Sequence, residues 1–193
     1  MADDLRDLFK YWKPEGDSPG DERDEIQERK ANPDANPYED TSERENRMPR
    51  SLNEKEVKVR GIWGSQDPNR PDAPPKQTFV LLQDNQGRKA PIFIGAFETM
   101  AIQMALENVT PERPLTHDLL KITIERMGGK VERITIDDLW QGTFYAKITV
   151  NYKDNTSIDL DCRPSDAIAI AIRTRAPIYM AEDVIEAAAK EDE

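Results

Sequence analysis

The 193-residue sequence has very few of the residues that build disulfides, thiolate metal sites and histidine-rich metal centres. Cys162 is the only cysteine, so no disulfide can form within the chain, and a reducing compartment fits best. His117 is the only histidine, which excludes a site with several histidine ligands. Any metal site must therefore be built from carboxylates with at most one imidazole.

Long apolar runs and several familiar enzyme motifs are also missing. No stretch approaches the roughly 20 apolar residues of a membrane-spanning helix, and no secretory signal pattern opens the chain. Glycine-rich phosphate loops, nucleophile elbows and zinc-ligand spacings are absent as well. We therefore expect a soluble, cytoplasmic protein without a membrane partner.

The sequence also lacks an excess of positively charged residues. The chain carries 27 Lys and Arg against 38 Asp and Glu, a formal net charge of −11. Residues 1–52 contribute −6 and the remainder −5, so neither part has a global basic field that would attract nucleic acid. A nucleic-acid site would need a local basic surface. An oligomer could assemble one from four side chains: Lys121, Arg126, Lys130 and Arg133.

Residues 1–52 differ in composition from the rest of the chain. They are rich in charge, proline, asparagine and serine and poor in large apolar side chains, a composition typical of disorder. Residues 4–12 are the exception, because Leu5, Leu8, Phe9 and Trp12 share one face of a helix. This short amphipathic segment either docks on its own domain or an oligomer partner, or stays disordered with the acidic tail.

Residues 53–190 have the patterning of one folded domain. Alternating or continuous apolar runs predict strands at 57–63, 78–82, 90–94, 131–139, 144–152, 157–162 and 178–180. Helical patterns fall at 96–107, 116–127, 164–174 and 182–190. This order predicts a single compact α+β domain with a mostly antiparallel sheet packed by helices.

Three of these helices have apolar positions that predict how they pack. In the first, Phe97, Met100, Ala101, Met104 and Ala105 share one face, which we expect to be buried. The second, with Thr116 as its predicted N-cap, has a wide apolar face and a β-branched run, so packing must hold it. That face consists of Leu119, Leu120, Ile122, Ile124 and Met127. The helix from Pro164 is apolar nearly all round and should be deeply packed.

The strands at 144–152 and 157–162 form the clearest predicted hairpin. Matching their apolar faces fixes the register, because a slip of one residue would turn every side chain to the wrong face. A three-residue loop with Asn155 in a left-handed conformation satisfies that register. The opposed pairs are then Ile148–Leu160, Ala146–Cys162, Lys147–Asp161 and Tyr145–Arg163. Cys162 falls on the apolar face, which favours a buried, unreactive thiol.

Residues 161–166 (Asp-Cys-Arg-Pro-Ser-Asp) mark the junction between the last strand of this hairpin and an apolar helix. Pro164 suits the first turn of a helix, where its missing N–H costs little. Ser165 and Asp166 can accept hydrogen bonds from the unpaired amides of that turn, so the pattern is typical of helix capping with an ion pair. Junctions of this kind are also where polar catalytic and binding side chains are often placed.

A set of polar side chains lies at the ends of predicted elements. Two or three carboxylates could hold Mg²⁺ or Mn²⁺, a histidine could act as general acid or base, and an arginine could bind a phosphate. Those are the parts of a phosphodiester-cleaving site, and they are also what capped helices and paired strands contain. The set comprises Glu98, His117, Asp118, Asp161, Arg163, Ser165 and Asp166.

Four ordered motifs resemble the bifunctional nuclease family. They are Pro-Ile-Phe-Ile-Gly at 91–95 with Glu98, Arg-Pro-Leu-Thr-His-Asp-Leu-Leu at 113–120, Gly-Thr-Phe-Tyr-Ala at 142–146, and Asp-Cys-Arg-Pro-Ser-Asp-Ala at 161–167. The resemblance covers about residues 53–187. It departs from the family pattern at Cys162, where alanine is usual, and at Thr99, where a small apolar residue is common.

The resemblance implies a compact α+β domain, frequent homo-oligomers, and a nuclease that degrades both RNA and DNA. By motif position it implies these functional residues: Glu98, His117, Asp118, Asp161, Arg163 and Asp166. The resulting hypothesis places Mg²⁺ or Mn²⁺ on Asp161, Asp166 and Glu98.

In that hypothesis His117 carries the proton and Arg163 holds the phosphate. The alternative is a non-catalytic module that binds a protein or nucleic acid, in which the same residues hold the fold together. A third possibility is that the acidic tail covers a basic surface and regulates it.

Overall fold

The computed structural model describes residues 53–65, 75 and 77–190, and the predictions for the tail at 1–52 lie outside them. Within the described part the order of strands and helices is the predicted one. The strands are β1 (Glu54–Ser65), β2 (Gln77–Asp84), β3 (Lys89–Ile94), β4 (Gly129–Trp140), β5 (Thr143–Tyr152), β6 (Ser157–Cys162) and β7 (Ile178–Ala181). The helices are α3 (Ala96–Leu106), α4 (Thr116–Arg126), α5 (Pro164–Thr174) and α6 (Glu182–Lys190).

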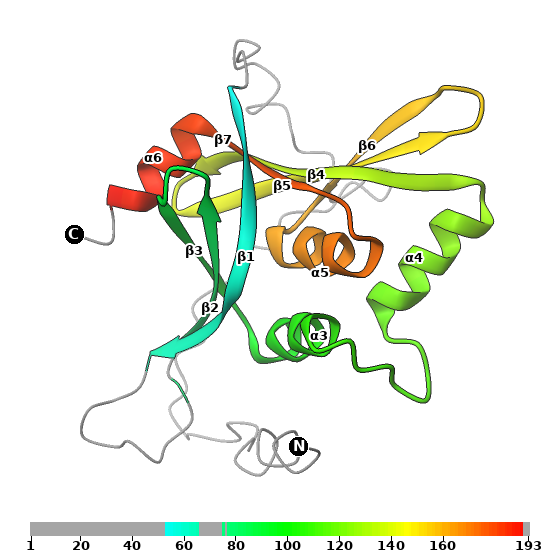
Figure 1. Cartoon of the computed structure of the whole chain (residues 1–193), viewed down its shortest axis with the longest axis horizontal. Helices are drawn as coiled ribbons and strands as arrows, with labels where there is room; N and C mark the ends of the chain where they lie inside the picture. Colours follow the sequence, from blue (N-terminus) through cyan, green and yellow to red (C-terminus); the bar gives the residue numbers. More distant parts are fainter. Residues whose placement is uncertain (1–52, 66–74, 76, 191–193) are drawn as a thin grey trace, which may run out of the picture. The chain divides into compact units, whose positions relative to one another are not determined.

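The described strands form one seven-stranded sheet in the order β3-β2-β1-β7-β4-β5-β6. Neighbouring strands pair antiparallel except β4 and β7, which are parallel. In Figure 1, β1 to β3 run steeply while β4 to β6 run across the view, so the sheet is strongly twisted. The prediction of an α+β domain with a mostly antiparallel sheet is confirmed, and no helix in the described ranges is long and apolar enough to cross a membrane.

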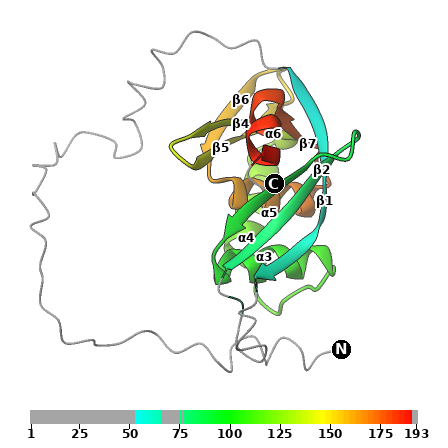
Figure 2. The ribbon, with the colours of Figure 1, turned by 90° about the vertical axis from the view of Figure 1, so that its left-hand side faces the viewer.

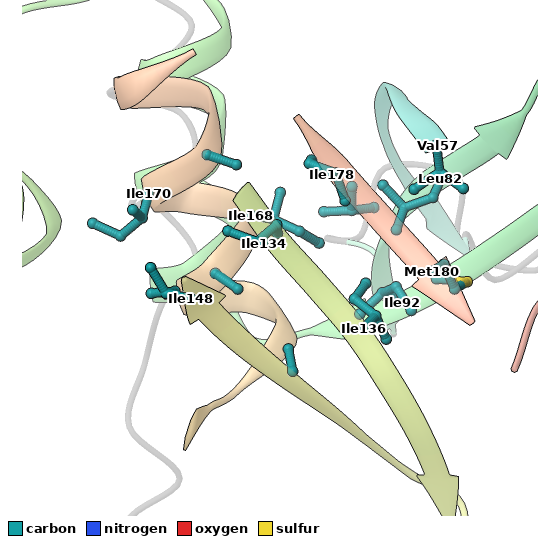
Figure 3. Packing of buried hydrophobic residues seen from close by; sticks show 14 of the residues in the cluster. Val57, Leu82, Ile92, Ile134, Ile136, Ile148, Ile168, Ile170, Ile178 and Met180 are labelled. Atoms are coloured by element: carbon teal, nitrogen blue, oxygen red, sulfur yellow. The ribbon is translucent and has the colours of Figure 1, made fainter. Parts of the chain in front are cut away.

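The hydrophobic core lies where both halves of the sheet meet α5. Figure 3 shows Leu82 and Ile92 from β2 and β3 gathered with Ile134 and Ile136 from β4 and Ile168 from α5. Burying each such aliphatic side chain contributes on the order of 1.5–3 kcal/mol. The middle of α5, residues 167–171, is almost completely buried, which confirms that this helix is deeply packed.

Helices α3 and α4 flank α5. All three lie below β4 and β5 in Figure 1, and α5 contacts both of the other helices. The alanines of α5 have no long side chains, which lets neighbouring elements approach its backbone closely. This packing brings the N-terminal turn of α5 toward α3 and α4, where several predicted site residues lie.

The hairpin of β5 and β6 has the register that the apolar pattern predicted. Ala146 pairs with Cys162, Lys147 with Asp161 and Ile148 with Leu160. Asn155 in the connecting turn has a φ of 63°, the predicted left-handed conformation. The predicted pair Tyr145–Arg163 does not form in this ladder, which ends at Ala146–Cys162 because the chain turns there into α5.

The exposed faces of α3 and α4 correct two sequence predictions. In α3 the buried residues are Thr99, Ala101 and Ile102, and Phe97 is 61% exposed. The helix is rotated relative to the predicted face, because an 11-residue segment rich in alanine and methionine has almost no preferred apolar side.

In α4 only Ile124 is buried among the residues of the helix. Its N-cap is Leu115 rather than Thr116, and the carboxylate of Asp118 accepts a hydrogen bond from the Leu115 amide at 2.9 Å. Leu119, Leu120, Ile122 and Met127 are exposed, so the wide buried face predicted for this helix is wrong for the chain described here.

Candidate functional site

Arg163 occupies the junction between β6 and α5 and is the centre of the candidate site. It is the N-cap residue of α5, and Pro164 starts the first turn as predicted. Its guanidinium donates to both carboxylate oxygens of Asp166, from Nε at 2.8 Å and from Nη2 at 3.1 Å. Its Nη1 donates to Oε1 of Glu98 in α3 at 2.8 Å. Hydrogen bonds from a planar fork to carboxylates are among the strongest in proteins.

His117 in α4 completes this network. Its Nε2 lies 3.1 Å from Oδ1 of Asp166, a distance at which the Nε2–H tautomer donates to the carboxylate. The hydrogen bond with His117, followed by those from Arg163, lowers the pKa of Asp166 to about 2 from an ordinary 3.8, although burial opposes the shift. We call Glu98, His117, Arg163 and Asp166 the Asp166 cluster. It joins α3, α4 and the start of α5.

The junction was predicted to combine helix capping with an ion pair, and only the ion pair forms. No side chain caps the first turn of α5. Asp166 instead turns its carboxylate to Arg163 and His117, and Ser165 is buried at the side of a groove. The pKa of Arg163 is raised, because its hydrogen bond with Asp166 stabilises the protonated guanidinium.

Asp118 and Asp161 are placed away from the Asp166 cluster. Asp118 accepts a hydrogen bond from Nε of Arg173 at 2.7 Å, near the other end of α5. Burial works against its ionisation, but the hydrogen bonds from Arg173 and the Leu115 amide outweigh that effect and lower its pKa. Asp161 is exposed on β6 opposite Lys147. Successive side chains of a strand alternate, so it points to the face opposite Cys162 and α5.

Cys162 has the environment that strand parity predicted. It packs against the core, and its Sγ lies 3.7 Å from the carbonyl oxygen of Ala146. Burial raises the pKa of its thiol to about 12, and the charges of Asp166 and Asp161 add to the shift. A thiol that stays protonated at neutral pH is a poor nucleophile.

A groove of about 300 Å³ opens beside the Asp166 cluster. Its lining includes Glu98, Arg163 and Ser165 together with Phe93 near the end of β3 and Phe144 in β5. Gly95 keeps this space open for the carboxylate of Glu98, because a Cβ at that position would lie 2.6 Å from Oε2.

Sequence reasoning missed the two phenylalanines as site residues. The family motifs already contained them, at 91–95 and 142–146, but as apolar strand positions they looked like core. Both line the groove, and Phe144 also packs against the hydrophobic core.

The arrangement of carboxylates does not favour the predicted metal ligands. Glu98 and Asp166 lie on two sides of the Arg163 guanidinium, so a cation between them would have to displace a charged group bound by three hydrogen bonds. Within residues 53–65, 75 and 77–190, no three His, Cys, Asp or Glu side chains are placed to hold a metal ion. The binding of Mg²⁺ or Mn²⁺ by Asp161, Asp166 and Glu98 stays a prediction.

Comparison with known proteins gives the family. Residues 80–193 match the family described as the bifunctional nuclease domain. An uncharacterized protein of Mycobacterium tuberculosis is 39% identical over 130 residues, which cover 67% of this chain and 73% of that protein.

Plant proteins show the same relationship at lower identity. Bifunctional nuclease 2 of Oryza sativa subsp. japonica is 33% identical over 119 residues, 60% of this chain and 37% of the rice protein. Bifunctional nuclease 1 of Arabidopsis thaliana is 29% identical over 113 residues, 57% of this chain and 35% of that protein. The matched region is thus little more than a third of either plant protein. The chain belongs to the bifunctional nuclease domain family.

Proposed function

We propose that this protein is a nuclease that hydrolyses phosphodiester bonds in both RNA and DNA, with the Asp166 cluster as its active site. One observation carries the proposal. A histidine, a carboxylate and an exposed arginine form one hydrogen-bonded chain beside a groove, in the motifs shared with the nuclease family. Phosphodiester hydrolysis uses an acid–base group and a phosphate-binding group, and here both bind the same carboxylate.

Arg163 is the phosphate-binding residue in this proposal. A guanidinium has five N–H donors, and three are used on Glu98 and Asp166. The two that remain, on a side chain that is 65% exposed, can reach a phosphate oxygen in the groove. Glu98 and Asp166 hold the guanidinium in one orientation, so less side-chain entropy is lost when the phosphate binds.

His117 moves the proton. Its Nε2 is bound to Asp166, which leaves Nδ1 as the nitrogen that exchanges a proton with water or with the leaving oxygen. The ionised Asp166 stabilises the imidazolium that forms and orients the ring. A divalent cation would supply Lewis-acid assistance and charge neutralisation at the phosphate when bound.

A non-catalytic interaction module is the second candidate, and a specific observation favours it. The same contacts connect the helices, since His117–Asp166 joins α4 to α5 and Arg163–Glu98 joins α5 to α3. The net charge of −11 also opposes the approach of a polyanion. In this alternative the cluster stabilises a binding surface and hydrolyses nothing.

The decisive experiment compares two carboxylates on the same pair of helices. Purified wild type, Asp166→Asn and Asp118→Asn are assayed on single-stranded RNA and DNA with Mg²⁺, with Mn²⁺ and with EDTA. We expect Asp166→Asn to lose activity while Asp118→Asn keeps it, although each removes a carboxylate that binds an arginine. Equal activity in all three proteins would place the activity elsewhere, and a wild type without activity would favour the non-catalytic module. Loss of activity in EDTA, restored by either metal, would support the cation.

The homo-oligomer implied by the family belongs to the same proposal. Leu119 and Ile122 of α4 and Met127 at its C-cap are exposed apolar side chains, and exposed apolar surface is typical of protein interfaces. We propose that a second copy of the chain covers these side chains. Light scattering after size exclusion tests it, because Leu119→Lys should then lower the mass to that of a monomer. A wild-type protein that is already monomeric would remove the idea.

A further inference from the structure

A row of three aromatic side chains crosses the outer face of β1, β2 and β3. Trp63 pairs with Phe79, and Phe79 pairs with Phe93. The residues beside them in these strands, Val80 and Ile92, are buried in the core, so strand alternation puts the aromatic rings on the opposite face. The ring centroids are 6.5 Å apart for Trp63–Phe79 and 5.7 Å apart for Phe79–Phe93. Figure 2 shows the three strands side by side.

The two outer rings of this row are open to solvent. Phe93 is 58% exposed and Trp63 is 43% exposed. Gly61 makes room for the indole, because a Cβ there would lie 3.1 Å from the Trp63 ring. The same glycine has a φ of 148° beside a bulge in β1, which other residues rarely adopt. The local backbone therefore lets the indole lie flat along its own strand.

Basic side chains lie farther along the same face. Lys58 pairs with Gln83 and Gln83 with Lys89 across the three strands, and all three side chains point outward. Arg60 donates from Nε to Oε1 of Gln83 at 2.6 Å. Lys58, Arg60 and Lys89 form no ion pair with any residue of the described ranges.

Lys58 and Arg60 line a hollow of about 330 Å³ together with two acidic residues, Glu56 and Asp84, of which Asp84 is paired with Arg88. This local basic group contrasts with the acidic chain as a whole.

The aromatic row is continuous with the Asp166 cluster. Phe93 belongs both to the row and to the lining of the groove that contains Glu98 and Arg163. A ligand lying along the row would therefore reach the arginine that we assign to the phosphate.

We propose that the outer face of β1, β2 and β3 binds single-stranded nucleic acid and delivers it to the Asp166 cluster. Bases stack on the rings of Phe93 and Trp63, and Lys58, Arg60 and Lys89 contact phosphates. Exposed rings with basic neighbours suit single strands, whose base faces are accessible, whereas bases in a duplex already stack on each other. The choice of substrate class rests on the proposed nuclease function, but binding to this face can be measured without cleavage.

The test measures binding of the full chain to labelled oligo-dT and oligo-U of about ten nucleotides, a length within the usual site size for single strands. Phosphorothioate linkages and EDTA prevent cleavage, and fluorescence anisotropy gives the dissociation constant. We expect Phe93→Ala and Trp63→Ala each to weaken binding about tenfold, as loss of one stacking ring does. The matched control is Val109→Ala, which removes an exposed apolar side chain from the loop after α3, away from the aromatic row. Thermal unfolding confirms that each variant is folded.

Salt dependence separates the phosphate contacts from the stacking. Lys89→Ala should lower the slope of log affinity against log salt by about 0.7, the value for one phosphate contact on a single strand. Lys153→Ala, an exposed lysine in the turn between β5 and β6, should leave the slope unchanged. A blunt duplex of the same length should bind more weakly and be indifferent to Phe93→Ala.

Unchanged affinity in both aromatic variants, or a duplex that binds as tightly as the single strand, would overturn the proposal. So would a wild-type chain that binds neither oligonucleotide, in which case the row fits a protein partner instead. The two proposals fail separately. Cleavage that is insensitive to Phe93→Ala and Trp63→Ala would contradict binding on this face but leave the nuclease proposal standing. Binding that depends on the rings, in a protein that cleaves nothing, would contradict the nuclease proposal but support binding on this face.

Discussion

An arginine–aspartate pair lies near each end of helix α5, each pair includes a contact with α4, and the two pairs differ in their access to solvent. Near the N-terminus, Arg163 binds Asp166, which also binds His117 of α4. Near the C-terminus, Arg173 binds Asp118 of α4. The α4 partners, His117 and Asp118, are neighbours in the sequence. The same residue types thus form two separate networks.

The two networks differ in how exposed the arginine side chain is and in how many of its N–H donors remain unused. The Arg173 side chain is 8% exposed, and it also donates to the carbonyl oxygen of Ala169, so its charge is used within the fold. The Arg163 side chain is 65% exposed and stands beside a groove with two N–H groups to offer. Identical pairing chemistry therefore serves stability at one end of α5 and, in our proposal, phosphate binding at the other.

The largest effect should come from His117→Ala, which tests the catalytic side of this comparison. General acid–base groups contribute roughly 10²- to 10⁴-fold, so we expect kcat on single-stranded RNA to fall within that range. Arg163 would keep its bond to Asp166, so KM should change little. The pH dependence of kcat is the second readout. A folded His117→Ala protein with wild-type kcat would contradict a proton-carrying role.

Arg173→Met tests the stabilising role of the C-terminal network. Methionine keeps the apolar stem but leaves the carboxylate of Asp118 without its arginine, and an unpaired, partly buried charge is costly. Since Asp118 is about a quarter exposed, we expect a loss of about 2–3 kcal/mol in the free energy of unfolding rather than the larger penalty of full burial. Urea denaturation measures it. Activity per folded molecule should be unchanged, and a selective loss of activity would assign the C-terminal network a functional role.

Much of the fold could be predicted because the spacing of apolar residues and the register of paired strands constrain it strongly. The β5–β6 hairpin has apolar faces on both strands, and only one register matches them, so the apolar pattern alone determines that Ala146 pairs with Cys162. The all-apolar pattern of α5 likewise has one solution, full burial. Where the apolar pattern was ambiguous, as in α3 and α4, the predicted faces were wrong.

The candidate site was only partly predictable because its members meet through packing. Arg163 and Asp166 are three residues apart at a helix start, so sequence spacing suggests their contact. Nothing in the sequence spacing distinguishes His117, which reaches Asp166, from Asp118, which reaches Arg173. That choice depends on how α4 is rotated against α5. A neighbouring residue on a helix points about 100° away, so adjacent side chains reach different partners.

The pH dependence of stability tests how strongly its neighbours hold Asp166 in the ionised form. The pKa of Asp166 is about 2 when folded and near 3.8 when unfolded, so the ionised carboxylate contributes stability above pH 4. That contribution is lost as the pH falls from about 4 through 2. Allowing for solvent screening, we expect about 1–2 kcal/mol. The free energies of unfolding of wild type and Asp166→Asn should converge in this interval. Parallel curves between pH 5 and 2 would show that Asp166 is not held ionised by its neighbours.

Arg163→Lys should have the smallest effect on stability and is the mirror of the Arg173 substitution. Lysine keeps a positive charge near Glu98 and Asp166 but loses the planar fork. Because the Arg163 side chain is mostly exposed, we expect the free energy of unfolding to change by less than about 1 kcal/mol. Activity should fall much more than stability, since a single ammonium cannot hold two carboxylates and a phosphate in fixed directions. If stability and activity fell together, the exposed network would be as structural as the buried one.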